Sequence, residues 1–467
     1  MKEQSTFDYD LLCIGSGPAG QRAAVQAAKL GKRSAVVERG RLIGGVCVDT
    51  GTIPSKTFRE AVLTVAGRAG LNDEFVFPGS SRRPSAQALM ARVAEVELRQ
   101  AEIIREQLLR NDVAILTGEA SFQDAHTVVV FRDGRSTAVT AANILIAVGM
   151  VPAPPPGLFP ESNLVVTSDE LLEFTSLPRR FAVVGAGVIG IEYASIYAAL
   201  GIDVTVVDKR PRPLEFLDAE LVDELLHQMR NAGVTFRLGE AVERLEVVEG
   251  PSRHVVILLD SGKRLVSDLT LFSAGRQGAT DRLNLSAAGL KADDRGRLTV
   301  DQTYRTSVRH IFAAGDVIGF PSLATTSAEQ GRLAACAAFG IDTEPMASHF
   351  PIGIYTIPEM SAVGEPEHVL TARRVPYESG VARYREIARG HIQGDDSGFL
   401  KMLFHREDHR LLGVHAVGTG ATELIHIGQA VLGLGGGLDY FLSTAFNYPT
   451  LAECYKVAAL DAFNKLT

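Results

Sequence analysis

The sequence predicts an α/β fold with two Rossmann-like domains and a C-terminal α+β domain. A strand–glycine–helix–strand pattern occurs twice, at residues 7–38 and 179–208. From about residue 348 the pattern changes to short apolar strands, such as 399–406 and 410–418, followed by helical stretches near 420–433 and 450–465. The 45 glycines suit an α/β protein, because tight strand-to-helix turns use this residue.

Each copy of the pattern places Gly-x-Gly-x-x-Gly between an apolar strand and an Ala-rich helix, and ends in an acid. The first glycine permits a tight turn, the second lets the backbone approach a pyrophosphate, and the third lets the helix pack on its strand. The acid accepts hydrogen bonds from ribose hydroxyls. The residues are Gly15, Gly17, Gly20 and Glu38 in the first copy, and Gly185, Gly187, Gly190 and Asp208 in the second.

Two dinucleotide sites in one chain imply two dinucleotides, or one that is held and one that exchanges. Flavin plus nicotinamide is the natural pairing, because a flavin takes a hydride from one carrier and releases electrons to another. A carboxylate after a strand–glycine turn, as at Asp316, is also well placed to bind polyol hydroxyls, although it equally suits an Asx turn.

Charge and composition argue against several classes of protein. The chain has 47 basic and 55 acidic residues, a net charge of −8 and no run of Lys or Arg, so we expect no nucleic-acid binding. A polar N-terminus and the absence of a long apolar run predict a soluble, cytoplasmic protein without a membrane segment. The cysteines lack metal-ligand spacing and a CxxC pair, so we expect buried thiols and no metal. They are Cys13, Cys47, Cys336 and Cys454.

Six short segments occur in a fixed order: GSGPAG, GGxCxxxGxIPSK, GAGVIGIE, SAGR, IFAAGD and PTLAE. With these segments the chain resembles the pyridine nucleotide–disulfide oxidoreductases over nearly its whole length. The resemblance implies an FAD domain, an inserted NAD(P) domain and a C-terminal domain that forms a homodimer or higher homo-oligomer. The limits we expect are 1–150 and 274–347 for the two parts of the FAD domain, 151–273 for the NAD(P) domain and 348–467 for the dimer-interface domain.

The same resemblance assigns roles to individual residues. It implies that Glu38 binds the adenosine ribose of FAD, that Asp316 contacts the flavin side chain or pyrophosphate, and that Lys56 pairs with Glu192 near the flavin. Polar residues 325–327 are expected to cap a helix within 322–339 whose N-terminus faces the flavin carbonyl edge. Two further glycines of the matched segments, Gly45 and Gly275, are assigned to the cofactor sites.

The chain departs from disulfide reductases at two points. Cys47 is kept, but Thr52 stands where the family has its flavin-proximal cysteine, and Tyr448 stands where it has a histidine, although Glu453 remains. A threonine hydroxyl cannot cycle as a thiol, and a tyrosine with a pKa of about 10 is a poor base at neutral pH. We therefore expect the disulfide chemistry to be lost and the hydride chemistry to remain.

This combination resembles the soluble pyridine nucleotide transhydrogenases at GTIPSK, GAGVIG and FNYPT. The resemblance implies transfer of a hydride between NADPH and NAD+ through bound FAD, with both nucleotides entering one site in turn. The catalytic residues expected are Lys56, Glu192, Thr52 and Cys47, where Cys47 either packs against the flavin or takes part in the reaction.

The second site contains an acid and bases together. Asp208 occupies the ribose-binding position, and Lys209 and Arg210 follow it directly. An acid repels the 2′-phosphate of NADP and an arginine attracts it, so the pair suits a site for both NAD and NADP. A solvated, charged turn is the plainer explanation.

Three other functions stay open at this point. One is an NAD(P)H dehydrogenase or diaphorase that passes electrons to quinones, dyes or oxygen. Another is a disulfide or mercuric reductase with a relocated thiol, which no second cysteine near Cys47 or Cys454 favours. The last is a flavin-binding sensor or assembly component, which would not need the Lys56–Glu192 pair.

Overall fold

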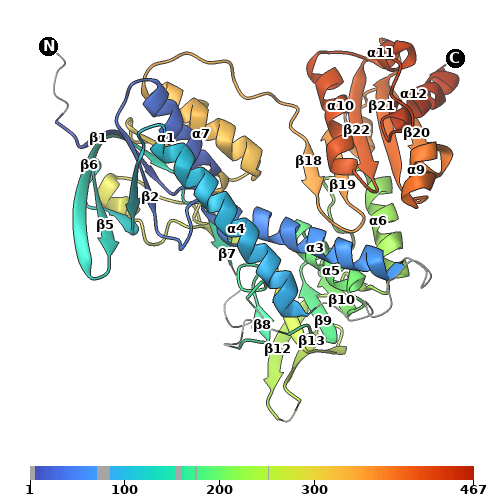
Figure 1. Cartoon of the computed structure of the whole chain (residues 1–467), viewed down its shortest axis with the longest axis horizontal. Coiled ribbons are helices and arrows are strands. Elements are labelled where there is room, and N and C mark those ends of the chain that lie inside the picture. Colours follow the sequence, from blue (N-terminus) through green and yellow to red (C-terminus); the bar gives the residue numbers. More distant parts are fainter. Residues whose placement is uncertain are drawn as a thin grey trace.

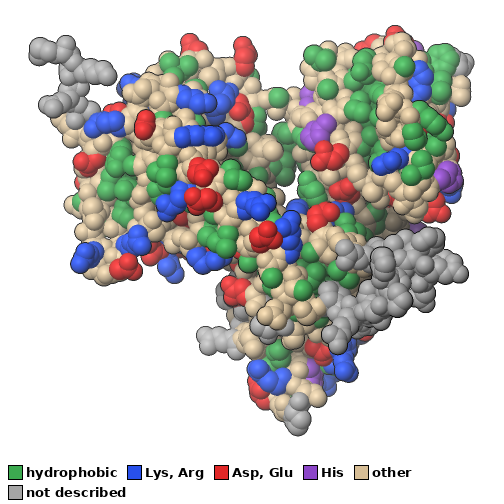
Figure 2. All heavy atoms as spheres, viewed as in Figure 1, with side chains coloured by type: hydrophobic (Ala, Val, Ile, Leu, Met, Phe, Trp, Pro, Cys, Tyr) green, Lys and Arg blue, Asp and Glu red, His purple; other side chains and the backbone are tan. Residues whose placement is uncertain are grey.

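The structure is a computed structural model, and it describes residues 6–70, 85–153, 157, 160, 162–173, 176–250 and 252–466. Three bodies surround two long helices, α3 (Thr52–Gly70) and α4 (Ala86–Leu109) (Figure 1). The helical periodicity of residues 89–111 predicts one long helix, and α4 confirms this prediction. Figure 2 shows the same three lobes, with acidic and basic side chains interspersed over this face.

The first body is a seven-stranded sheet in the order β3-β2-β1-β6-β5-β4, with β17 also paired to β6. Strands β1, β2, β3 and β17 run parallel to the C-terminal part of β6, and the β4-β5-β6 part is antiparallel. Helices α1 (Pro18–Lys29) and α7 (Ala324–Ala338) pack against each other beside this sheet. The strands are β1 (Tyr9–Ile14), β2 (Ser34–Glu38), β3 (Ala114–Thr117), β4 (Glu119–Phe122), β5 (Thr127–Arg132), β6 (Arg135–Ile146) and β17 (Ile311–Ala313).

The second body repeats this plan with a five-stranded parallel sheet in the order β11-β10-β9-β15-β8. In both sheets the strand that leads into the glycine turn, β1 or β9, lies between the strand that ends in the acid and a strand from later in the chain. Helices α5 (Val188–Ala199) and α6 (Ala219–Asn231) follow β9 and β10. The strands are β8 (Val165–Val166), β9 (Arg180–Val184), β10 (Asp203–Asp208), β11 (Thr235–Leu238) and β15 (Leu269–Phe272), with an antiparallel sheet of β12 (Val242–Val248), β13 (His254–Leu259) and β14 (Arg264–Ser267).

The chain enters and leaves the second body through two paired strands. Strand β7 (Met150–Pro152) pairs antiparallel with β16 (Arg276–Gly278), so the outgoing and returning segments lie side by side. The expected domain limits near 150 and 274 fall at these strands and stay a prediction.

The third body has a five-stranded antiparallel sheet in the order β18-β19-β22-β21-β20, as expected for an α+β domain. Helices α10 (Ala421–Gly433) and α12 (Glu453–Leu466) match the two helical stretches expected from sequence, whereas the short helix α11 (Leu438–Ser443) was not expected. The strands are β18 (Ile352–Ile354), β19 (Met360–Gly364), β20 (Tyr377–Arg383), β21 (Phe399–His405) and β22 (Leu411–Val417), and the remaining helices are α2 (Val46–Asp49), α8 (Glu367–Ala372) and α9 (Ala388–Gln393).

A hydrophobic core joins the second and third bodies. Phe399 and Val417 of the third sheet belong to the same buried cluster as Ile191 of α5 and Leu221 of α6. Within the described part of the chain, no helix combines the length and the apolar character needed to cross a membrane.

Candidate functional site

The two glycine turns have nearly the same geometry. Gly15 and Gly185 adopt φ values of +106° and +109°, a region that L side chains rarely adopt. A Cβ on Gly20 would lie 1.9 Å from the Gly15 carbonyl oxygen, and a Cβ on Gly190 would lie 1.9 Å from that of Gly185. Any side chain at these positions would therefore push the helix away from its strand.

The middle glycine of each turn faces open space. A Cβ on Gly17 or Gly187 would meet no heavy atom within 4 Å, although both residues have ordinary φ values. Gly17 lines a cavity, so the wall there is bare backbone at the start of α1. This is the close approach that a pyrophosphate needs at a helix N-terminus.

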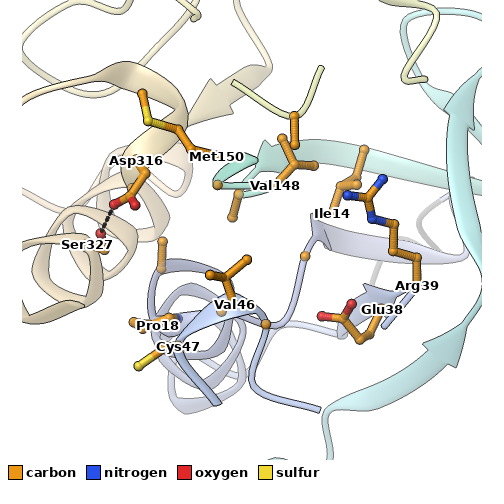
Figure 3. Close-up of a pocket in the computed structure, with 18 of the residues that line it drawn as sticks. Ile14, Pro18, Glu38, Arg39, Val46, Cys47, Val148, Met150, Asp316 and Ser327 are labelled. Carbon is orange, nitrogen blue, oxygen red and sulfur yellow. Dashed lines mark hydrogen bonds between the residues drawn. The ribbon is translucent and has the colours of Figure 1, made fainter. Parts of the chain in front are cut away.

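The cavity beside Gly17 is elongated, as Figure 3 shows. Glu38 and Arg39 lie at one end, and Cys47, Asp316 and Ser327 lie toward the other. Its further lining residues include Gly45, Thr52, Val148, Met150, Ser322 and Ala324.

The residues around this cavity fit FAD. An acid lies at one end, bare backbone lies in the middle, and a thiol and a helix N-terminus lie at the other end. This order matches the ribose, the pyrophosphate and the flavin ring along an FAD molecule. Gly45 contributes to the backbone wall, because its φ is +62° and a Cβ there would lie 2.9 Å from the Gly17 Cα.

Glu38 is held by polar groups of the glycine turn. The Ser16 N–H and hydroxyl donate to Glu38 Oε2 at 3.1 and 2.5 Å, and the Gly40 N–H donates to Oε1 at 2.6 Å. The Gly44 N–H in turn donates to Ser16 Oγ at 2.8 Å. Ser16 therefore ties the acid to the segment that carries Cys47.

Asp208 in the second unit is held in a different way. The Ala186 N–H donates to Asp208 Oδ2 at 2.6 Å, as Ser16 does to Glu38. The place of the serine hydroxyl is taken by Arg210, whose Nε and Nη2 donate to the two carboxylate oxygens at 3.0 and 2.7 Å. Burial alone would raise the pKa of Asp208, but the hydrogen bonds from Arg210 and Ala186 lower it below its usual value.

Two further bases belong to this turn. Lys209 is exposed, as Arg210 is. Arg212 turns toward α6, where its Nη2 donates to Asp223 Oδ1 at 2.5 Å and to the Ala219 carbonyl at 2.9 Å. Arg210 is thus the base that neutralises the ribose-position acid.

Asp316 follows β17 and faces the N-terminal end of α7. Burial raises the pKa of Asp316, while the charge of Arg276 and a hydrogen bond from the Ser327 hydroxyl at 3.4 Å act in the opposite direction. The capping prediction for residues 325–327 is wrong. The N-cap is Leu323, because the three polar residues already lie within α7 and Thr326 donates its hydroxyl proton back to the carbonyls of Pro321 and Leu323.

Cys47 and Thr52 lie together at the Asp316 end of the cavity. Burial raises the pKa of the Cys47 thiol, a hydrogen bond from Thr52 and the charge of Lys56 oppose this effect, and the charge of Asp316 adds to it. The sulfur thus has a hydroxyl as its neighbour where a disulfide partner would stand.

Lys56 of the central helix α3 and Glu192 of α5 form an ion pair that joins α3 to the second body. Lys56 Nζ donates to Glu192 Oε2 at 2.7 Å, and the Glu192 side chain is only 5% exposed. The other oxygen, Oε1, accepts the N–H of Tyr355 at 2.8 Å. The structure thus brings the expected pair together and adds a contact from the third body.

Other predicted site residues lie apart from this pair. Gly275 follows β15 with a φ of +149°. Tyr448 is 68% exposed, and Glu453 begins α12 with its Oε2 buried and unpaired.

One cluster of the described residues has the spacing of a metal site. It consists of the carboxylates of Asp218, Glu220 and Glu367. The ammonium of Lys401 lies at 3.0, 2.8 and 2.7 Å from these three groups and is itself buried. The carboxylates therefore neutralise a lysine that joins α6 to the third sheet.

The chain matches the family Pyridine nucleotide-disulphide oxidoreductase over residues 9–331, and the dimerisation domain of that family over residues 350–459. It belongs to this family. The family uses FAD and NAD(P), so this member is an oxidoreductase whose C-terminal domain supports the expected homodimer.

Curated relatives of this chain include proteins named soluble pyridine nucleotide transhydrogenase. The protein of Mycobacterium bovis BCG is 52% identical over 98% of both chains, and that of Photobacterium profundum is 43% identical over 100% of this chain and 99% of its own. Among solved structures, LpdA of Mycobacterium tuberculosis is similar with a TM-score of 0.89 at 27% identity, covering 96% of this chain and 99% of its own. The flavoprotein disulfide reductase RclA of Escherichia coli has a TM-score of 0.87 at 25% identity, covering 98% and 100%.

Three contacts of the site were not predicted from sequence. Ser16 stands between two predicted glycines, so its position in the motif was the available signal. Arg276, which donates to the Met150 carbonyl at 2.8 Å and pairs with Asp169 at 3.3 Å, stands in the matched SAGR segment. Tyr355 belongs to no matched motif, and no sequence signal pointed to it.

Proposed function

We propose that this chain moves a hydride between NADPH and NAD+ with bound FAD as the carrier and without a redox-active disulfide. The observation that carries the proposal is that Thr52 lines the cavity beside Cys47, which puts a hydroxyl where a thiol relay needs its second sulfur. The other three cysteines are buried, and Cys13 and Cys454 lie in separate hydrophobic clusters. The names of the relatives at 43% and 52% identity support the same reaction.

The predicted FAD-holding residues have distinct tasks. Glu38 accepts ribose hydroxyls, Gly17 and Gly45 offer backbone to the pyrophosphate, and Asp316 binds polar groups toward the ring. When bound, FAD supplies a carrier that accepts a hydride from one nicotinamide and returns it to another. The N-terminus of α7 lies at that end of the cavity and favours negative charge there.

The exchanging nucleotide has its own set of residues. Gly187 offers backbone to the pyrophosphate, while Asp208 binds the ribose of NAD and Arg210 neutralises that acid when a 2′-phosphate arrives. Lys56, fixed by Glu192, supplies positive charge near Cys47. One such site serves both nucleotides in turn.

The alternatives are less well supported. A dehydrogenase that uses quinones as its main acceptor is not favoured by the relatives. A disulfide or mercuric reductase with a relocated thiol would need a second cysteine beside Cys47, and the other three cysteines are all buried as free thiols. A pure flavin-binding role would leave the Lys56–Glu192 pair without a use. Cytoplasmic placement stays a prediction from sequence.

The test is steady-state kinetics with NADPH and thio-NAD+ in the absence of oxygen. Thio-NADH is followed by its absorbance, and parallel initial-rate lines are expected because the two nucleotides use one site in turn. A quinone and a small disulfide serve as competing acceptors. Faster turnover with the quinone than with thio-NAD+ would replace the proposal with the dehydrogenase alternative.

A further inference from the structure

Tyr355 contacts both members of the Lys56–Glu192 pair. It directly follows β18, so it belongs to the third body, whereas Lys56 lies on the central helix α3 and Glu192 belongs to the second body. Its ring centroid lies 5.0 Å from Lys56 Nζ, and its N–H donates to Glu192 Oε1 at 2.8 Å. One residue of the third body thus holds the acid and covers the base.

A polar chain lies at the far end of the Tyr355 ring. The Tyr355 hydroxyl lies near Thr422 of α10, whose own hydroxyl donates to Glu359 Oε2 at 2.8 Å. Glu359 Oε2 also lies 3.9 Å from Arg59 Nη2, one turn after Lys56 on α3. The ring therefore lies against a polar chain that returns to the helix carrying Lys56.

The backbone of the same segment is anchored independently of the ring. Arg59 Nε donates to the Thr356 carbonyl at 2.9 Å, and the Ile357 N–H donates to Ser195 Oγ at 3.0 Å. Together with the bond from the Tyr355 N–H to Glu192, these contacts hold the segment between α3 and α5. Replacing only the Tyr355 side chain leaves all three in place.

A lysine needs such support because its long side chain is flexible. The ion pair with Glu192 fixes the Lys56 ammonium from one direction, and the ring covers it from another. A cation above an aromatic face is attracted by the ring quadrupole, more strongly where water is partly excluded. The Lys56 side chain is 25% exposed, so this condition is met.

We propose that Tyr355 is a positioning residue, which holds Lys56 in the direction that its role at the flavin requires and so makes that role depend on the C-terminal domain. The inference rests on the proposed function of the Lys56–Glu192 pair.

The first test needs no nicotinamide nucleotide and no turnover. Lys56 is labelled with an amine-reactive reagent in apo and FAD-loaded protein, and the labelling rate is measured by mass spectrometry for the wild type, Tyr355→Phe and Tyr355→Leu. We expect Tyr355→Leu to raise the Lys56 rate about threefold or more and Tyr355→Phe to leave it within about twofold, because phenylalanine keeps the ring. An unchanged rate in Tyr355→Leu overturns the proposal.

The chain offers a matched control. Lys32 lies 5.3 Å from the ring centroid of Phe339, far along the sequence from the Lys56 contact. Phe339→Leu is expected to raise labelling of Lys32 alone and to leave the kinetics unchanged. In Tyr355→Leu the Lys32 rate stays at its wild-type value, and a general rise across all lysines would indicate unfolding and count against the proposal.

The second test is the rate at which NADPH reduces the bound flavin with no acceptor present. We expect Tyr355→Leu to lower the limiting rate of flavin reduction about tenfold, while the NADPH concentration at half-saturation stays within about twofold of the wild-type value. The double variant with Lys56→Met and Tyr355→Leu is expected to be no slower than Lys56→Met alone. Additive losses, or an equal loss in Tyr355→Phe, overturn the proposal. Because this readout needs only the NADPH half-reaction, it still decides the role of Tyr355 if thio-NAD+ proves not to be an acceptor.

Discussion

The Arg210 guanidinium donates two hydrogen bonds to the Asp208 carboxylate, from Nε to Oδ1 at 3.0 Å and from Nη2 to Oδ2 at 2.7 Å. The Arg210 side chain is 43% exposed and that of Asp208 is only 5% exposed. The base is therefore the accessible member of the pair, and the acid presents little uncompensated charge to an arriving nucleotide.

Arg210→Gln is expected to raise the KM for NADPH about tenfold and to leave the KM for NADH within about twofold, because the uncovered acid repels only the nucleotide with a 2′-phosphate. Steady-state kinetics with each donor measures this change. Arg212→Gln is the matched control, since that guanidinium pairs with Asp223 of α6. Equal increases for both donors would show that Arg210 has no part in accepting the phosphate.

Cys47→Ser is expected to keep kcat for NADPH and thio-NAD+ within about threefold of the wild type, because no thiol takes part in the reaction. Serine preserves a polar group beside Thr52. In the same assay, kcat of Lys56→Met is expected to be about tenfold or more below the wild-type value, because the substitution removes the positive charge near the flavin. A hundredfold loss in Cys47→Ser would mean that the thiol takes part in the chemistry.

Lys401→Met is expected to lower the free energy of unfolding by about 3–5 kcal/mol, because it leaves the buried Asp218 carboxylate without its cation. Urea denaturation of the FAD-loaded protein measures the change. The control is Lys465→Met, which breaks an exposed pair with Asp461 and should cost less than about 1 kcal/mol. Similar decreases in the free energy of unfolding for the two variants would show that the burial of Lys401 and its carboxylates adds nothing to stability.

The burial of His415 leads us to expect that folding stability decreases in acid. Burial lowers the pKa of His415 to about 4, and the charges of Lys401 and His368 add to this effect, while Asp218 and the Glu365 carbonyl oppose it. In the unfolded chain the His415 imidazole is protonated below about pH 6.5, whereas in the folded chain it is protonated only below about pH 4. The free energy of unfolding therefore falls as the pH drops through this window.

His415→Gln removes this contribution, so its stability should fall by roughly 3 kcal/mol less than that of the wild type between pH 7 and pH 4. Denaturation curves at several pH values measure the difference. His426→Gln, at an exposed position, should follow the wild-type curve. Parallel curves for wild type and His415→Gln would contradict the lowered pKa.

The repeated units could be predicted from sequence because each one is a local pattern. Gly20 and Gly190 each must lie against the carbonyl of a glycine five residues earlier, and such short-range demands leave a recognisable spacing. The strands, the long helix α4 and the C-terminal α+β body also follow from periodicity. The pairing of Lys56 with Glu192 came from the family resemblance, since no local pattern joins α3 to α5.

The remaining contacts could not be read from the sequence because they join distant segments. Lys401 reads as one charge in an apolar strand, and only the fold brings it to Asp218 and Glu367. Tyr355 likewise meets Lys56 across two bodies without any shared motif. The cap of α7 was misplaced because Thr326 and Ser327 are typical capping residues, yet here they face the turn before the helix and Asp316.

Electrons are expected to pass from the reduced flavin to a second nicotinamide with no thiol in between, and rapid mixing measures this transfer. The FAD-loaded Cys47→Ser variant is reduced without oxygen by one equivalent of NADPH and is then mixed with NAD+, while flavin and NADH absorbance are recorded together. We expect flavin absorbance to return as NADH appears, at a rate at least equal to kcat. Flavin that stays reduced in the variant but is reoxidised in the wild type would contradict it.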